Sequence, residues 1–84
     1  MTAQPAATIL IVDDEPAIRR FLRTSLEVQG YRTIDAADGT AALETLRRNA
    51  VDLIVLDLGL PGIDGFDVIR RLRAAGSSVP IVVL

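Results

Sequence analysis

The chain has 84 residues, half of them hydrophobic, with a formal net charge of −2 and a pI near 4.8. This length allows at most one small core, and the acidic balance argues against nucleic-acid binding by this segment. Cysteine, histidine and lysine are all absent, which excludes disulfides, thiolate chemistry and cysteine-based zinc sites. Any chemistry must therefore rest on carboxylates, hydroxyl groups, the backbone or a bound metal.

No apolar run approaches the roughly 20 residues that a membrane helix needs. The first residues, MTAQPAAT, lack both the positive start and the apolar stretch of a signal peptide. We therefore expect a soluble, cytoplasmic protein with no membrane partner. Residues 1–7 are expected to form a flexible tail.

The first predicted element is a strand at residues 8–12, TILIV. This run is apolar throughout rather than alternating, as in a strand buried on both faces of a parallel sheet. The sequence DDEP follows. Proline is favoured in a first helical turn and acidic residues suit the positive end of the helix dipole, so a helix is expected from Pro16. Apolar residues then recur at helical spacing, and Gly30 is a suitable stop.

The middle of the chain continues the alternation of strand and helix. Residues 31–36 are expected to form a short strand whose mixed polarity suits a sheet edge. The sequence DGT at residues 38–40 starts a second helix that ends near Asn49. Residues 51–56, VDLIVL, form the most apolar of the predicted strands.

A loop rich in proline and glycine, residues 58–64, leads to a third helix at residues 65–75. A fourth strand is expected at residues 79–84. We assign Phe21 and Phe66 to the core. We assign three arginine clusters, at positions 19/20/23, 47/48 and 70/71/73, to solvated helix faces.

The order of the predicted elements indicates the fold class. Strands and helices alternate from residue 8 onward, which predicts a three-layer α/β fold with a parallel sheet, helices on both faces and right-handed crossovers. Ligands of such sheets bind outside the carboxyl ends of the strands, where the strand order reverses. Functional side chains are therefore expected directly after the strands.

Three aspartates follow two of the predicted strands. Asp13 and Asp14 come after the first strand, and Asp57 comes after the third. If these strands are neighbours, about 4.8 Å apart, the three carboxylates converge in one cleft. Their charges repel one another unless a cation lies between them. A site built only from oxygen ligands and water suits Mg²⁺.

Simpler interpretations exist for each acidic residue. Asp13, Asp14 and Glu15 are typical of helix caps, and Asp57 is typical of a turn after a strand. A single cap does not, however, require two adjacent aspartates and a third after another buried strand. The combination therefore favours a metal site, whereas Asp64 is predicted to cap the third helix and not to bind metal.

Three stretches, ILIVDDEP, LIVLDLGLPGIDG and VPIVVL, resemble the receiver domain of two-component response regulators, which is CheY-like. The resemblance extends from Thr8 to the end of the sequence. The segments EPAIRRFLR and DLGLPGIDG are most similar to the transcription-factor branch that carries a winged-helix DNA-binding domain, and within it to the potassium-transport regulators. The resemblance implies a flavodoxin-like sheet with strand order 2-1-3-4.

The resemblance also assigns roles to individual residues. Asp57 would be the phosphoacceptor, which takes a phosphoryl group from a phosphohistidine of a sensor histidine kinase. Asp14, Asp57 and the backbone carbonyl of Gly59 would bind Mg²⁺ directly, and Asp13 would act through water. Phosphoryl transfer depends on positioning and electrostatics more than on a base. The absence of histidine from this chain is no obstacle, because the kinase would supply the phosphohistidine.

The resemblance ends after the fourth strand. In the family a fifth strand and two more helices follow, and a Ser or Thr after the fourth strand and a Lys after the fifth contact the phosphoryl group. We therefore expect residues 8–84 to be the N-terminal two-thirds of a receiver domain from a longer protein. The apolar fourth strand or the open helix face is expected to promote self-association. DNA binding is expected only through an output domain outside this chain.

Phosphoacceptor signalling is therefore the leading interpretation, and no enzyme activity is expected beyond incidental loss of the phosphoryl group. A first alternative is an interaction module that does not accept phosphate. A second is a phosphohydrolase of the haloacid-dehalogenase type, which usually has a second Asp where this chain has Gly59. A dinucleotide-binding enzyme would have a glycine-rich turn in place of DDEP.

Overall fold

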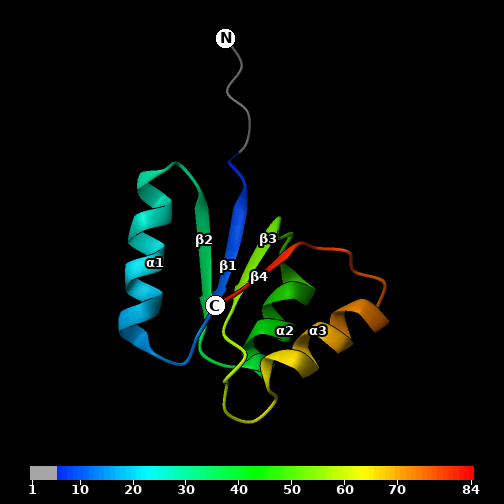
Figure 1. Cartoon of the computed structure of the whole chain (residues 1–84). Helices are drawn as coiled ribbons and strands as arrows, with labels where there is room; N and C mark the ends of the chain where they lie inside the picture. Colours follow the sequence, from blue (N-terminus) through cyan, green and yellow to red (C-terminus); the bar gives the residue numbers. More distant parts are fainter. Residues whose placement is uncertain (1–5) are drawn as a thin grey trace.

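A four-stranded sheet flanked by three helices forms the described part of the chain, residues 6–84 of a computed structural model (Figure 1). The predicted alternation of strand and helix is confirmed. Of the expected tail at residues 1–7, residues 1–5 lie outside the described residues. The elements are β1 (Thr8–Val12), α1 (Pro16–Val28), β2 (Arg32–Ala36), α2 (Gly39–Arg48), β3 (Leu53–Leu56), α3 (Gly65–Ala74) and β4 (Ile81–Val83).

The strands are parallel and lie in the order β2-β1-β3-β4, which confirms the flavodoxin-like arrangement. The chain passes from β1 to β2 on one side and, after crossing back, from β3 to β4 on the other. The strand order therefore reverses between β1 and β3. Val12 and Leu56 are the last residues of these two strands and are paired with each other. The residues after them consequently start at the same edge of the sheet.

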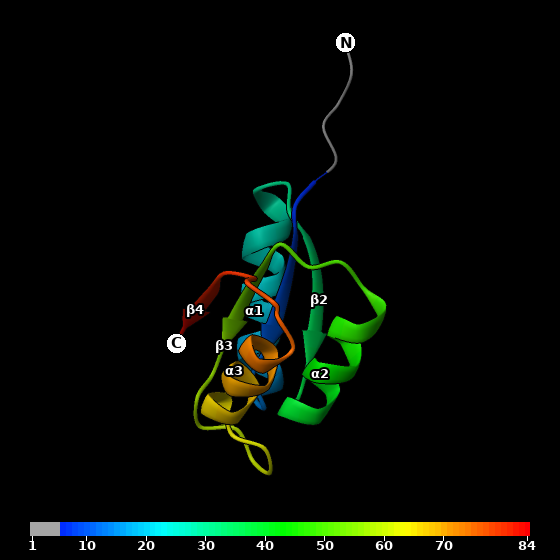
Figure 2. The same cartoon turned by 90° about the vertical axis from the view of Figure 1, so that its right-hand side faces the viewer.

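Helices cover both faces of the sheet, with α1 on one side and α2 and α3 on the other (Figures 1 and 2). The face toward α1 presents Ile9, Ile11 and Val55, which pack with Leu22 and Leu26. The opposite face holds the larger core, because the even-numbered residues of β1 and β3 pack there with α2 and α3. Its buried members are Leu10, Val12, Ala36, Ala42, Ile54, Leu56, Leu60, Val68 and Leu72.

Three strands are shorter than the sequence indicates. β2 begins at Arg32 and not at Tyr31, β3 begins at Leu53 and not at Val51, and β4 spans only Ile81–Val83. At the start of β3, the carboxylate of Asp52 accepts a bond from Thr8 N at 2.7 Å, while Asp52 N donates to Thr8 O at 2.8 Å. The Asp52 carboxylate thus accepts the bond from Thr8 N that a main-chain carbonyl would accept if β3 were longer.

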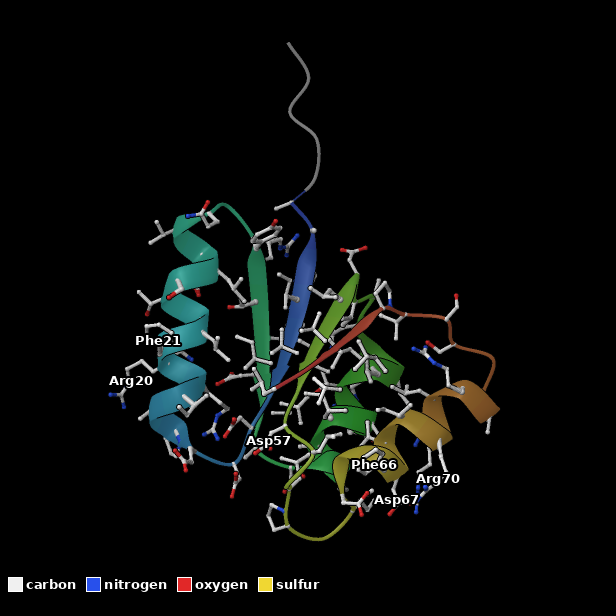
Figure 3. All side chains as sticks on the ribbon, viewed as in Figure 1. Arg20, Phe21, Asp57, Phe66, Asp67 and Arg70 are labelled. Carbon is white, nitrogen blue, oxygen red and sulfur yellow. The ribbon has the colours of Figure 1, made fainter. Side chains whose placement is uncertain are left out.

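The assignment of both phenylalanines to the core is wrong. Phe21 is 67% exposed and Phe66 is 56% exposed, and both are labelled in Figure 3. In α1 the side chain next to Phe21, Leu22, packs on the sheet. Phe21 itself lies about 100° farther round the helix. Phe66 precedes the buried Val68 by two residues, which places it on the other side of α3.

The starts of α2 and α3 were correctly predicted, and in each helix a side chain forms the cap. Asp38 accepts a bond from Ala41 N at 2.8 Å, and Asp64 accepts one from Asp67 N at 2.9 Å. Both bonds satisfy an N–H that the first helical turn leaves free. In residues 6–84, no helix combines the length and apolar character that crossing a membrane requires.

Candidate functional site

The three predicted aspartates meet at the carboxyl end of the sheet. Asp13, Asp14 and Asp57 each have a carboxylate oxygen within 4.8 Å of the other two. Main-chain bonds extend the ladder past the strand ends, because Asp57 N donates to Val12 O at 2.9 Å and Asp13 N donates to Ala36 O at 3.2 Å. The predicted convergence is confirmed, and it lies where the strand order reverses.

Asp13 is the buried member of the cluster. It is 6% exposed and is the one buried charged or polar residue within residues 6–84. Its Oδ1 accepts a bond from Glu15 N at 2.8 Å, and its main-chain carbonyl accepts one from Arg19 Nη1 at 2.7 Å. Burial of a carboxylate costs free energy unless an opposite charge or hydrogen bonds compensate it. The bond from Glu15 N holds the Asp13 side chain in place, and a cation beside it would compensate its charge.

Asp57 is partly buried and lies at the lower end of the sheet in Figure 3. Its Oδ1 accepts a bond from Gly59 N at 2.9 Å. A carboxylate has two oxygens, each able to accept more than one bond, so acceptor capacity remains for a further ligand. The bond confirms that Asp57 shapes the turn after β3, which is compatible with a second role at the cluster.

The interpretation of Asp13 and Asp14 as caps of α1 is wrong. The N-cap residue of this helix is Glu15, whose side chain makes no capping bond, and Pro16 begins the helix. The Asp13 carboxylate binds the N–H of Glu15, before the first helical residue. Asp64, in contrast, caps α3 as predicted. The paired aspartates after β1 therefore have no capping role that would explain both of them.

The loop after Asp57 is held against the start of α3. Gly65 N donates to Leu58 O at 3.2 Å. A Cβ atom on Gly65 would lie 2.6 Å from Leu58 Cα and 2.9 Å from Asp57 O. Only glycine allows this approach of helix to loop. The position of Gly59 follows from the same loop; the binding of metal by its carbonyl stays a prediction.

One arginine beside the acidic cluster was assigned wrongly from the sequence. Arg19, expected on a solvated face, has a side chain only 18% exposed, and it binds both Asp13 O and the carboxylate of Asp35. The sequence did contain a signal for a charged partner, because Asp35 lies between the apolar residues Ile34 and Ala36 near the end of β2. The pairing of Asp35 with this helix requires the tertiary structure and is not visible in helical periodicity.

The donors of the site fit a hard divalent cation. They are carboxylate oxygens, one on a buried residue, one on an exposed residue and one on a partly buried residue. Mg²⁺ prefers one or two carboxylates together with retained water molecules. The exposed side of the cluster, at Asp14, leaves room for such water. A cation would also offset the mutual repulsion of the three carboxylates.

Comparison with known proteins decides the family. The family model described as the response regulator receiver domain matches residues 9–84. The chain belongs to this family. Receiver domains are signalling modules that interact with sensor histidine kinases and bind Mg²⁺ at an acidic pocket, and this receiver domain carries the corresponding acidic cluster.

Curated relatives of this receiver domain are named as response regulators or as transcriptional regulators. The response regulator MprA of Mycobacterium sp. (strain KMS) is 46% identical over 76 residues, which are 90% of this chain and 33% of the relative. The transcriptional regulatory protein AfsQ1 of Streptomyces coelicolor is 48% identical over 77 residues, 92% of this chain and 34% of the relative. The receiver domain thus spans about a third of the length of these proteins.

Solved structures of receiver domains share the fold. A receiver protein from Pseudomonas putida superposes with a TM-score of 0.92 at 26% identity, over 98% of this chain and 69% of that one. The N-terminal domain of a receiver protein from Methanoculleus marisnigri gives 0.87 at 37% identity, over 90% and 63%. The predicted receiver resemblance is confirmed. The closer resemblance to potassium-transport regulators stays a prediction.

Proposed function

We propose that this receiver domain accepts a phosphoryl group on Asp57, with Mg²⁺ bound at the acidic cluster. The observation that carries the proposal is the meeting of three carboxylates within 4.8 Å, at the point where the strand order reverses, in a chain that matches the receiver family over residues 9–84. The proposal treats the domain as a phosphoacceptor and not as an enzyme that turns over substrate.

The environments of the three aspartates suggest how they divide the work. Exposed Asp14 and partly buried Asp57 would bind the metal directly, with the carbonyl of Gly59. Buried Asp13, whose Oδ1 is already bonded to Glu15 N, would act through water. Mg²⁺, when bound, offsets negative charge on the phosphoryl group during transfer.

Asp57 acts as the nucleophile in this proposal. One of its oxygens is oriented by the bond from Gly59 N, and the carboxylate is held at the end of a buried strand. An Asp57 oxygen forms a bond to phosphorus while the bond from phosphorus to the donor's imidazole nitrogen breaks. The donor histidine keeps that electron pair. Positioning is what the chain supplies, since the step needs no base.

The proposed physiological partner is a sensor histidine kinase, and the proposed location is the cytoplasm. The names of two relatives, the transcriptional regulatory protein AfsQ1 and the probable transcriptional regulator ycf27, support a parent protein that regulates transcription. Any contact with DNA would come from an output domain outside this chain, since the chain itself has a net charge of −2.

Chemical phosphorylation tests the proposal without knowledge of the kinase. The chain is incubated with a small acyl phosphate and Mg²⁺, and its intact mass is measured. We expect the addition of one phosphoryl group, which a metal chelator prevents and Asp57→Asn abolishes. Asp52→Asn is the matched control, because Asp52 lies just before the opposite end of the same strand, and it should remain modifiable.

The opposite result would favour the alternative of a binding module. If the wild-type chain stays unmodified at saturating Mg²⁺ and donor while it remains folded, this chain does not accept phosphate by itself. Equal modification of wild type and Asp57→Asn would place the acceptor elsewhere and contradict the proposal.

We further propose that the 84-residue chain self-associates through β4. Within the described residues, this strand pairs only with β3, so its other edge carries free main-chain groups. Val82 is 50% exposed and Val83 is 45% exposed beside that edge. Exposed apolar edges favour pairing between chains.

A further inference from the structure

One guanidinium group joins three elements beside the acidic cluster. Arg19, in the first turns of α1, donates from Nη1 to the main-chain carbonyl of Asp13 at 2.7 Å. Its Nε lies 3.3 Å from Oδ2 of Asp35 in β2. The side chain of Arg19 is 18% exposed, in contrast to its outward-directed neighbour Arg20 in Figure 3. Arg19 therefore connects the loop after β1 to both α1 and β2.

Asp35 is well placed to hold Arg19. It is paired in register with Ile11, whose side chain lies in the core beneath α1, so Asp35 faces the same helix. Arg23, one helical turn after Arg19, also approaches Asp35, with Nη1 3.4 Å from Oδ2. Two arginines of α1 thus share one carboxylate, and Arg19 is the one that reaches on to Asp13.

These bonds leave Asp13 little freedom. Its N–H donates to Ala36 O, its carbonyl accepts from Arg19 and its carboxylate accepts from Glu15 N. Among these three partners of Asp13, Arg19 is the one that binds through its side chain, whereas Ala36 and Glu15 bind through the main chain. Asp14 follows directly in the chain, so a shift of the Asp13 carbonyl rotates the peptide that carries Asp14.

We infer that Arg19 is a positioning residue: held by Asp35, it fixes the loop at Asp13 and Asp14 in the shape that binds the cation. The inference rests on the proposed metal site and concerns a residue that does not touch the metal. Groups that orient metal ligands from outside commonly change affinity by about 10- to 100-fold when removed.

The direction in which Mg²⁺ affinity changes distinguishes a positioning role of Arg19 from a purely electrostatic one. Removing a positive charge near three carboxylates should strengthen cation binding if simple electrostatics decides the outcome. Loss of positioning should weaken it. Arg19→Gln is therefore compared with Arg20→Gln, which removes the same charge from the adjacent, exposed residue of the same helix.

Calorimetric titration of the 84-residue chain with Mg²⁺ provides the first measurement. We expect Arg19→Gln to weaken binding about tenfold and Arg20→Gln to leave it equal or slightly tighter. Arg19→Lys keeps the charge but cannot reach two acceptors through one planar group, so its affinity should be intermediate. Asp35→Asn should weaken binding in the wild type and have little added effect in Arg19→Gln.

Amide hydrogen exchange of the metal-free chain provides the second measurement. The N–H of Glu15 reports on the loop, because it is bonded to Asp13 Oδ1. We expect it to exchange faster in Arg19→Gln and at the wild-type rate in Arg20→Gln. Gly30→Ala, which strains a residue with φ of +94° and no atom within 4 Å of a Cβ, controls for a general loss of stability.

The outcomes distinguish the two proposals. Wild-type Mg²⁺ affinity and wild-type Glu15 exchange in Arg19→Gln would overturn the role of Arg19 while leaving the metal site intact. Equal losses in Arg19→Gln and Gly30→Ala would also overturn it, by showing a stability effect. If the wild-type chain binds no Mg²⁺, the proposed function fails, and the exchange measurement alone decides whether Arg19 orders the loop.

Discussion

Asp13 and Asp14 are adjacent in the sequence but have opposite environments. Asp13 is 6% exposed and is fixed by three hydrogen bonds, whereas Asp14 is exposed to solvent. The same residue type thus has two tasks: one carboxylate is part of the framework and the other is available to a ligand. Substitution of the exposed residue should therefore change binding without damaging the fold.

Asp14→Asn tests this division at the residue scale. We expect Mg²⁺ affinity to fall by more than about tenfold, the loss that even an outer partner of a metal can cause. The metal-free chain should be as stable as wild type or slightly more stable, because one of three neighbouring negative charges is removed. Calorimetry with Mg²⁺ and thermal unfolding measure the two effects.

Asp52→Asn serves again as the control for Asp14→Asn. This residue lies before β3 and outside the acidic cluster, so its substitution should leave Mg²⁺ affinity unchanged. The substitution should lower the free energy of unfolding, because it weakens the bond that the Asp52 carboxylate accepts from Thr8 N. Unchanged Mg²⁺ affinity in Asp14→Asn would show that Asp14 is not a ligand.

At the scale of elements, the close contact between α3 and the loop after β3 determines where Asp57 lies. Gly65 begins α3, and a Cβ there would come within 2.9 Å of Asp57 O and even closer to Leu58. These neighbours include main-chain atoms, which cannot rotate away as a flexible side chain can. A shift at the start of α3 should therefore also displace the main chain at Asp57, the proposed phosphoacceptor.

Gly65→Ala is predicted to disturb this connection. Overpacking of this kind costs about 1–3 kcal/mol, and the loop that carries Gly59 must shift to relieve it. We expect lower stability in thermal unfolding together with weaker Mg²⁺ binding and slower modification by an acyl phosphate.

Gly30→Ala is the matched variant for this prediction. Its φ of +94° is unfavourable for alanine, at a cost of roughly 1–2 kcal/mol. Gly30 belongs to the connection between α1 and β2, and this connection lies at the end of the sheet opposite the loop after β3 (Figure 1). Gly30→Ala should lower stability and leave Mg²⁺ binding unchanged at temperatures where the chain is folded. Equal effects of both variants on binding would contradict the proposed connection.

The elements and the site differ in how far the sequence predicts them. Apolar runs such as TILIV and LIVL, and caps such as Asp38 and Asp64, carry local signals, so the alternation of strand and helix was correct. The meeting of the aspartates followed from their places after two strands. The predictions of a buried Phe21 and a solvated Arg19 were wrong, because the exposure of both side chains depends on which side of the helix meets the sheet.

At the scale of the whole molecule, the sheet has two different edges. The edge at β2 carries polar residues such as Arg32 and Asp35, which suits an edge strand. The edge at β4 carries Val82 and Val83, both about half exposed. The chain is therefore expected to associate at one edge and not at the other.

Val82→Lys tests association through β4. Sedimentation of the wild-type 84-residue chain over a range of concentrations should show dimers or larger species. The variant should shift the distribution toward monomer, because a charged residue discourages pairing at an edge. Val28→Lys is the control, since Val28 is 78% exposed at the end of α1. A wild-type monomer at all concentrations would contradict the prediction.

The central claim is that Asp57 itself receives the phosphoryl group. Loss of modification in Asp57→Asn does not prove this alone, since the same change removes a proposed Mg²⁺ ligand. The most direct measurement treats the phosphorylated chain with borohydride, which reduces an aspartyl phosphate to homoserine, and locates the altered residue by peptide mass spectrometry. We predict homoserine at position 57 only. Homoserine at Asp13, Asp14 or any other position, with Asp57 unchanged, would contradict the account.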